Sequence, residues 1–254
     1  MEATASNDDY EHVLAGVMYV VNNIPGPGVD VVDFESEYST GCSCTAECHS
    51  CSCTRGSANY SDARIIDENS SVPIYECNGN CTCQSYCGNR LVQNGPLNCL
   101  VVREAAGKGL GLFTTGTIQK GRFICEYAGE VISLHEARRR IETNRRHNAM
   151  NYVLVVREHY GNRVAVTCID PERFGNIGRY ANHSCDPNSS LVPVRVEGIV
   201  PRLCLFASRE IKNGEEVTFN YAGGLAADSV HCLSDTPCLC GSNSCFGYLP
   251  YDPV

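Results

Sequence analysis

The stretch Arg-Tyr-Ala-Asn-His-Ser-Cys-Asp-Pro-Asn, residues 179–188, decides how the rest of the chain is interpreted. From Asn182 to Asp186 it presents in succession an amide, an imidazole, a hydroxyl, a thiol and a carboxyl. So many hydrogen-bonding groups beside a potential metal ligand indicate a site rather than a packed core element. The alternative is a polar turn closed by Asp186 and Pro187. The stretch alone favours that turn, because loops of this composition are common.

The chain has 254 residues and 43% apolar content, enough for one large domain or two small ones with a core. Its formal charge of -9 argues against non-specific binding to nucleic acid, because phosphates carry the same sign, and favours a basic partner. The alternative is that the acidic balance only keeps the protein soluble. We therefore expect no direct binding to DNA.

Cysteine is the compositional anomaly, since the chain contains 18. Residues 1–10 carry three acidic side chains and no basic one, unlike a secretory signal. No apolar run reaches the roughly 18 residues that span a bilayer. We expect a soluble chain in a reducing compartment with no membrane partner, where clustered cysteines bind zinc more often than they form disulfides.

Two groups of cysteines follow residue 41. They comprise Cys42, Cys44, Cys48, Cys51, Cys53, Cys77, Cys81, Cys83 and Cys87. These nine cannot all pair as disulfides, but six terminal and three bridging sulfurs would give each of three tetrahedral zinc ions four bonds. Cys-x-Cys pairs also suit metal better than a strained disulfide. We expect a trinuclear zinc cluster, with a disulfide knot or separate mononuclear sites as the alternatives.

The pattern of apolar residues predicts many short strands and one helix. Ser133 and Glu136 form a capping box, so a helix is expected from there to about Arg146. A solvated basic helix face is expected, with a weak nuclear-localisation patch as the alternative, from Arg138, Arg139, Arg140, Arg145 and Arg146. Residues 1–40 are expected to form an extended arm on the main domain. The expected strands are 98–104, 122–132 with a break at 128–129, 151–157, 163–169, 190–196, 203–207 and 216–221. Without βαβ alternation, the fold class is β-rich, mainly β with few helices.

Two further motifs are ambiguous by themselves. The glycine-rich turn at 107–112 lets backbone groups approach a ligand, but it fits neither a Rossmann nor a phosphate-loop pattern. The C-terminal Cys238, Cys240 and Cys245 leave a tetrahedral zinc one ligand short, and Cys185 or Cys232 could complete it. Four isolated cysteines in predicted strands are expected to be small buried apolar residues, namely Cys99, Cys125, Cys168 and Cys204.

Taken in order, these motifs resemble a known family. The nine-cysteine cluster, Lys-Gly-Leu-Gly at 108–111, Glu-Tyr-Ala-Gly-Glu at 126–130, the stretch 179–188, Phe-Asn-Tyr-Ala-Gly at 219–223 and the final Cys-x-Cys-x4-Cys look like a SET-domain protein lysine methyltransferase with pre-SET and post-SET modules. The resemblance covers about residues 41–249. It implies a SET-domain fold of small β-sheets, in which the Asn-His-Ser-Cys segment and the strand bearing Tyr221 thread together as a pseudoknot, an exception to unknotted connections.

The same resemblance implies four parts and one cofactor. The parts are an N-terminal arm at 1–40, a pre-SET zinc module at 41–98, a catalytic SET domain at 99–222 and a post-SET zinc module at 232–249. The cofactor is S-adenosylmethionine, contacted by the backbone of the glycine-rich turn and by the Asn-His pair. The expected cofactor-binding residues are Lys108, Gly109, Leu110, Tyr152, Arg179, Asn182, His183 and Tyr221.

The resemblance also resolves the C-terminal cysteines. It implies that Cys185, rather than Cys232, joins Cys238, Cys240 and Cys245 on a fourth zinc, which holds the post-SET tail over the cofactor. An aromatic residue beyond the last cysteine packs on the cofactor in the family. Phe246, Tyr248 and Tyr251 qualify here, while Pro250 stands at the expected place.

The expected chemistry needs little from the protein, because a sulfonium methyl is already activated and a neutral lysine amine need only be presented in line with it. A desolvated channel beside a cation lowers the pKa of that amine. Tyr221 is expected to orient the amine or the methyl group, with Tyr152 lining the site. Phe219, two residues earlier on the same strand face, is associated in the family with room for more than one methylation, so at least the dimethyl product is expected.

The resulting hypothesis is that the protein is a histone-lysine N-methyltransferase. Its expected substrate is the tail of histone H3, as a peptide or within the nucleosome, and its expected location is on chromatin in the nucleus. Residues 153–158 differ from the Leu-Phe-Asp-Leu-Asp run common in the family, which leaves the target lysine open. Two alternatives are a catalytically silent zinc-rich chromatin-binding or protein-binding module and a secreted disulfide-rich protein. The Asn-His pair and Tyr221 argue against the first, and the odd cysteine cluster argues against the second.

Overall fold

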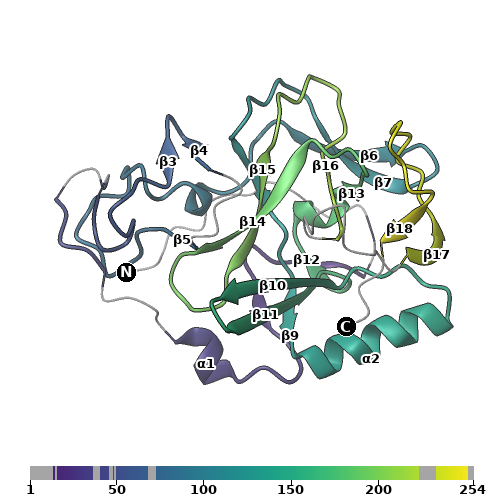
Figure 1. Ribbon diagram of the computed structural model, residues 1–254, viewed down its shortest axis with the longest axis horizontal. Helices are drawn as coiled ribbons and strands as arrows, with labels where there is room; N and C mark the ends of the chain where they lie inside the picture. Colours follow the sequence, from purple (N-terminus) through teal and green to yellow (C-terminus); the bar gives the residue numbers. More distant parts are fainter. Residues whose placement is uncertain are drawn as a thin grey trace.

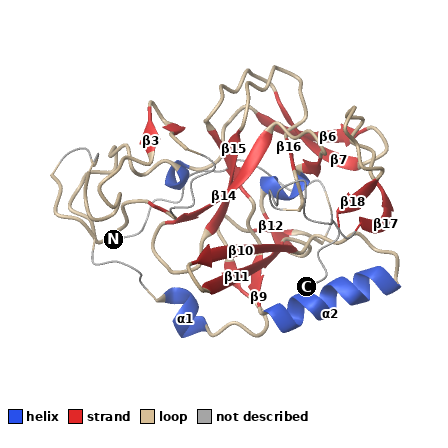
Figure 2. Ribbon diagram, in the orientation of Figure 1, coloured by secondary structure: helices blue, strands red, loops and turns tan. Residues whose placement is uncertain are grey.

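The computed structural model describes residues 14, 16–36, 41–45, 48, 50–67, 73–222 and 233–250. Strands dominate, and the described residues form two α-helices, α1 (Val31–Glu35) and α2 (Leu134–Arg146), as expected for a mainly β chain (Figures 1 and 2). The strands are β1 (Met18–Tyr19), β2 (Ile24–Pro25), β3 (Tyr60–Ser61), β4 (Arg64–Ile65), β5 (Ile74–Tyr75), β6 (Leu100–Ala105), β7 (Gly109–Thr114), β8 (Phe123–Glu126), β9 (Glu130–Ile132), β10 (Leu154–Tyr160), β11 (Arg163–Asp170), β12 (Phe174–Gly175), β13 (Asn182–His183), β14 (Ser189–Arg195), β15 (Arg202–Ala207), β16 (Thr218–Phe219), β17 (Leu233–Pro237) and β18 (Tyr248–Pro250). Neither helix is both long and apolar enough to cross a membrane.

Two four-stranded sheets carry the core. One has the order β5-β14-β15-β8, and the other has the order β10-β11-β9-β2. β15 is almost entirely buried, because Leu203 and Leu205 pack into one core cluster while Phe206, on the opposite face, packs into another. Near-continuous apolar runs of this kind are typical of strands covered on both faces. The remaining sheets have two strands each, so the expectation of small sheets is confirmed.

The described part of the N-terminal arm lies on the main body. β1 pairs in parallel with β12, and β2 pairs in parallel with β9. The short helix α1 was not expected, and it begins where Asp30 accepts hydrogen bonds from the Val32 and Asp33 amides. The arm thus adds strands to two sheets whose other members come from far along the chain.

Helix α2 begins and ends as predicted. The Ser133 hydroxyl accepts a hydrogen bond from the Glu136 amide at 3.2 Å, and Ala137 and Ile141 pack on Cys168 of β11. The prediction of a solvated basic face is wrong for Arg140, whose side chain is 14% exposed. Its guanidinium lies between Glu130, Asp170 and Glu136, because the second turn of the helix faces the ends of β9 and β11.

Most predicted strands are confirmed to within a few residues, but the last is shorter than expected. A strand was predicted at 216–221, and the observed strand there, β16, consists of Thr218 and Phe219. The backbone leaves it because the Tyr221 amide donates to His183 Nδ1 and the Asn220 side chain accepts from the Ala222 amide. Cys99 lies just outside β6 and is half-buried, whereas the other isolated strand cysteines are buried, namely Cys125, Cys168 and Cys204.

Candidate active site

The parallel pairing of β13 with β16 brings the Asn-His pair beside the segment that ends at Tyr221 (Figure 1). Asn182 aligns with Thr218, and His183 aligns with Phe219. The Tyr221 amide donates to His183 Nδ1 at 3.2 Å, and the Tyr221 hydroxyl donates to the Ala181 carbonyl at 3.2 Å. Two segments expected to thread together are therefore joined by both backbone and side-chain hydrogen bonds.

Aromatic rings enclose this junction. The ring centroids of Phe219 and Tyr221 are 4.9 Å apart, those of Tyr127 and Phe219 are 5.9 Å apart, and those of His183 and Tyr221 are 5.3 Å apart. The Tyr127 hydroxyl donates to the Tyr152 carbonyl at 2.7 Å. Tyr127 was not among the predicted site residues, although its position inside the Glu-Tyr-Ala-Gly-Glu motif directly after β8 was the available signal.

Burial sets the protonation of these groups. It raises the pKa of Tyr221 and that of Tyr127, so both phenols are neutral near pH 7 and can donate hydrogen bonds. Burial, followed by the nearby Lys108 ammonium, lowers the pKa of His183 to about 4. Because Nδ1 of that neutral imidazole accepts the Tyr221 amide, its proton is on Nε2, which faces the Cys185 sulfur at 3.4 Å.

The glycine-rich turn lies on the other side of the Asn-His pair. The Asn182 amide nitrogen donates to the Leu110 carbonyl at 3.1 Å and to Glu216 Oε1 at 2.8 Å. The ammonium of Lys108 pairs with the same glutamate. Gly109 has a φ of +76°, which favours glycine, and no heavy atom stands within 4 Å of where a Cβ would be. Backbone at this turn is therefore open to a ligand.

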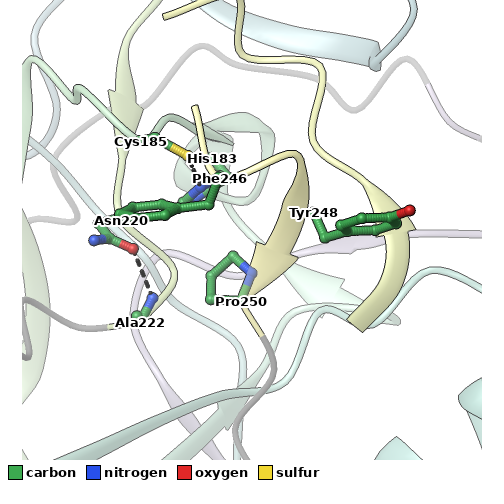
Figure 3. Close-up of a pocket in the computed structure, with 7 residues that line it drawn as sticks. All are labelled: His183, Cys185, Asn220, Ala222, Phe246, Tyr248 and Pro250. Carbon is green, nitrogen blue, oxygen red and sulfur yellow. Dashed lines mark hydrogen bonds between the residues drawn. The ribbon is translucent and has the colours of Figure 1, made fainter. Parts of the chain in front are cut away.

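A pocket lies between the Asn-His pair and the C-terminal tail (Figure 3). Its lining residues are His183, Cys185, Asn220, Ala222, Phe246, Tyr248 and Pro250. The Phe246 ring projects towards Asn220 and His183, whereas the Tyr248 ring points to the far side of its strand (Figure 3). Tyr251 lies outside the described residues. An aromatic face beside a neutral imidazole and an amide suits a purine, and the turn with Lys108 suits a charged group, so the donor set fits S-adenosylmethionine.

The C-terminal cysteines meet the opening stretch at this pocket. The sulfurs of Cys185, Cys238, Cys240 and Cys245 lie within 4.8 Å of one another, and those of Cys185 and Cys238 are 3.8 Å apart. Zinc–sulfur bonds of about 2.3 Å give a tetrahedron with edges of about 3.8 Å, so these four thiols could hold one zinc. Cys232, the rival ligand, lies outside the described residues.

The nine other clustered cysteines also converge. Groups of four sulfurs within 4.8 Å of one another include Cys42, Cys44, Cys48 and Cys51 in one set and Cys48, Cys77, Cys83 and Cys87 in another. The sulfurs of Cys53 and Cys81 lie 3.6 Å apart. Cys42, Cys48, Cys77 and Cys83 each belong to more than one group and are buried, which suits bridging ligands. The described thiols form no disulfide.

Of the predicted cofactor-binding and catalytic residues, His183 lines the pocket and the others lie outside its lining, Arg179 and Tyr152 among them. The Arg179 side chain is buried, its Nε donates to the Pro171 carbonyl at 2.9 Å, and its guanidinium lies 4.6 Å from the centre of the Tyr152 ring. The structure therefore places Arg179 behind Tyr152. Tyr152 joins the aromatic junction through its carbonyl, which accepts from Tyr127.

Family comparisons agree with this geometry. The SET domain model matches residues 109–222, and the Pre-SET motif model matches residues 2–90. The chain is 40% identical over 251 residues to the rat histone-lysine N-methyltransferase SETMAR, covering 92% of this chain and 79% of that protein.

Solved structures are also similar. The methyltransferase domain of human SETMAR has a TM-score of 0.84 at 38% identity, covering 95% of this chain and 91% of that domain. Arabidopsis thaliana SUVH6 in complex with S-adenosylmethionine has a TM-score of 0.76 at 28% identity, covering 95% of this chain and 51% of that one. KRYPTONITE in complex with mCHH DNA, an H3(1-15) peptide and S-adenosylhomocysteine has a TM-score of 0.72 at 28% identity, covering 96% and 49%.

Proposed function

The chain belongs to the SET-domain histone-lysine N-methyltransferases, and on this premise we propose that it methylates a lysine of the histone H3 tail to at least the dimethyl state, with S-adenosylmethionine as methyl donor. The observation that carries the proposal is the pairing of β13 with β16, which gathers Asn182, His183 and Tyr221 in one site. We further propose that it acts on nucleosomes, in the nucleus on chromatin.

The pocket lining is aromatic and polar, and the charged Lys108 lies outside it with Asn182, to which it is linked through Glu216; together these groups match the two ends of the cofactor. Phe246 and the neutral His183 would hold the purine, while Lys108 and Asn182 would hold the amino-acid end. When bound, S-adenosylmethionine supplies a methyl group already activated on a sulfonium. SUVH6 was solved with this cofactor, which supports the assignment.

Tyr221 is placed to orient the lysine amine. Its hydroxyl hydrogen is donated to the Ala181 carbonyl, so the oxygen keeps lone pairs that can accept an N–H from an incoming amine. Tyr127 and Phe219 exclude water around that oxygen, because both rings are buried. A dry site beside a sulfonium disfavours a second cation, so the amine is held in its neutral, nucleophilic form.

The histone tail would bind as an added strand. Within the described part of the chain, β10 is the outer strand of its sheet and begins two residues after Tyr152, so its outer edge can pair with an extended peptide. A net charge of -9 favours the approach of a basic tail. KRYPTONITE was solved with an H3(1-15) peptide, which supports H3 as the substrate.

Product state and metal content complete the proposal. Phe219 is 1% exposed between Tyr127 and Tyr221, and the absence of a hydroxyl on its ring leaves space for methyl groups on the amine. Three zinc ions in the pre-SET cluster, bridged by Cys42, Cys48 and Cys77, and a fourth in the post-SET tail would stabilise modules with little apolar core.

Transfer of labelled methyl from S-adenosylmethionine to H3 tail peptide and to nucleosomes tests the function. The zinc-loaded protein should label H3, and Tyr221→Phe should lower kcat by about a hundredfold, because a positioned hydrogen-bonding group is lost. Its affinity for S-adenosylhomocysteine should stay within about threefold, since the pocket residues remain. Cofactor binding without transfer to any histone would instead favour the binding-module hypothesis.

A further inference from the structure

A carboxylate outside the predicted site contacts two predicted cofactor-binding side chains, Lys108 of the glycine-rich turn and Asn182 of β13. Glu216 Oε1 accepts from the Asn182 amide nitrogen at 2.8 Å, and its Oε2 pairs with the Lys108 ammonium. The Glu216 side chain is 17% exposed, and that of Lys108 is 16% exposed. One carboxylate thus joins a residue of the turn between β6 and β7 to a residue of β13.

The position of Glu216 is itself fixed by its surroundings. Its backbone bridges Phe113 of β7, and its carbonyl accepts from the Asn188 side chain at 2.7 Å. Gly111 leaves the space that the carboxylate occupies, because a Cβ there would stand 2.7 Å from Glu216 Oε1 and 3.1 Å from the Asn182 amide nitrogen. The carboxylate therefore has a defined orientation towards the amide.

The consequence concerns which way the Asn182 amide faces. Both hydrogens of its nitrogen are used, one by the Leu110 carbonyl and one by Glu216. Among the described residues no donor reaches its Oδ1, which remains an acceptor with no partner from the chain. A carboxylate can only accept, so it excludes the flipped amide that would present the nitrogen instead.

We propose that Glu216 is a positioning residue for the cofactor: it fixes the Asn182 amide so that Oδ1 accepts from the ammonium of the cofactor's amino-acid end, and it holds the Lys108 ammonium beside the carboxylate of that end. The inference rests on the proposed function, because it assigns a residue to the same cofactor site. Glu216 acts through its two partners and does not touch the reacting atoms.

The test replaces Glu216 with an isosteric amide. In Glu216→Gln, either the new NH2 group faces the Lys108 ammonium or it faces the Asn182 NH2 group, so one contact is lost in either orientation. Calorimetric titration with S-adenosylhomocysteine should show Kd raised about tenfold, the effect of losing one charge-assisted hydrogen bond. The KM for S-adenosylmethionine should rise similarly, while kcat at saturating cofactor and the KM for peptide stay within about twofold.

A matched control and a second variant separate positioning from folding. Glu210→Gln makes the same chemical change at an exposed carboxylate that accepts from Gln119, and it should leave Kd unchanged. Gly111→Ala keeps Glu216 and Asn182 but crowds both, together with the Ala105 Cβ at 2.9 Å, and it should also weaken cofactor binding. Zinc content and Tm are measured for every variant.

An analogue of S-adenosylhomocysteine that lacks the α-amino group identifies the contact. Glu216→Gln should weaken its binding much less than that of S-adenosylhomocysteine, because the group that Asn182 accepts from is missing. Equal Kd values for wild type and Glu216→Gln, or equal losses with both ligands, would overturn the inference. A parallel fall in Tm, kcat and peptide affinity would show a structural role and also overturn it. If the wild type binds neither ligand, the proposed function itself fails.

Discussion

Replacement of Arg140 by methionine tests how the buried ion pairs of α2 hold the helix to the sheet β10-β11-β9-β2. Arg140 Nη1 contacts Glu130 Oε2 and Asp170 Oδ2, each at 2.8 Å, and its Nε contacts Glu136 at 2.9 Å. The Glu130 and Asp170 side chains are 11% and 1% exposed, so methionine leaves two carboxylates without their shared cation. Removing one partner of a buried pair costs about 3–5 kcal/mol.

The same helix supplies the matched control. Arg146 also pairs with a glutamate four residues earlier, at 2.8 Å, but its side chain is 73% exposed. Arg146→Met should therefore change the free energy of unfolding by less than about 0.5 kcal/mol. Both variants replace an arginine of α2 with methionine, so the comparison isolates the effect of burial.

Urea titration and thermal unfolding of the zinc-loaded proteins measure the difference. For a chain of this size, a loss of about 3–5 kcal/mol corresponds to a fall in Tm of roughly 6–20 °C. Arg140→Met should show that fall, and Arg146→Met should melt within about 2 °C of the wild type. Two variants of equal stability would refute the view that Arg140 holds α2 to the ends of β9 and β11.

Three further predictions concern the methylation state of the product, the zinc site of the C-terminal cysteines and the pH dependence of stability. Phe219→Tyr adds a hydroxyl at a site that is 1% exposed, so mass spectrometry of methylated peptide should show a shift towards the monomethyl product; an unchanged product ratio would contradict the proposed role of Phe219. Cys245→Ser should remove one zinc per chain by native mass spectrometry and raise the KM for S-adenosylmethionine about tenfold, because Phe246 follows this ligand; loss of all zinc would disprove separate modules. Burial raises the pKa of Glu126 from 4.5 to about 7, against a smaller opposing effect of Arg202. The folded protein therefore holds this proton more tightly than the unfolded chain, and the contribution of Glu126 to stability should fall as pH rises from 4.5 to 7. Glu126→Gln should remove that decline and be more stable than the wild type at pH 8, by on the order of 2 kcal/mol, with equal pH profiles as the contrary result.

The local sequence was sufficient to predict one helix and several strands. The capping box at Ser133 predicted the start of α2, because a hydroxyl followed three residues later by a glutamate satisfies the first amides of a helix wherever the helix lies. Short apolar runs predicted β8, β14 and β15 to within two residues. These signals depend on neighbours in sequence, so the sequence contains them in full.

Other features depend on neighbours that are distant in sequence. Arg140 looked like any surface arginine until the helix was placed against Glu130 and Asp170. Tyr127 lies inside a recognised motif, but its place in the site was missed because its ring meets Phe219 only through the packing of β8 near β16. The end of β16 at Phe219 follows from the hydrogen bond of Tyr221 to His183, 38 residues away.

By itself, the sequence determined the inventory of chemistry: an odd cluster of nine thiols, three more at the C-terminus, and an amide, an imidazole and a thiol in the stretch 179–188. It could do so because ligand type and number are properties of composition and spacing. The family resemblance implied that Cys185 joins the C-terminal thiols and that the Asn-His pair meets the strand of Tyr221, but only the tertiary structure decided the contacts that hold these groups and brought Asn182 to Glu216. Contacts of this kind arise when sheets and modules pack, so their geometry follows from the whole fold and not from any one segment.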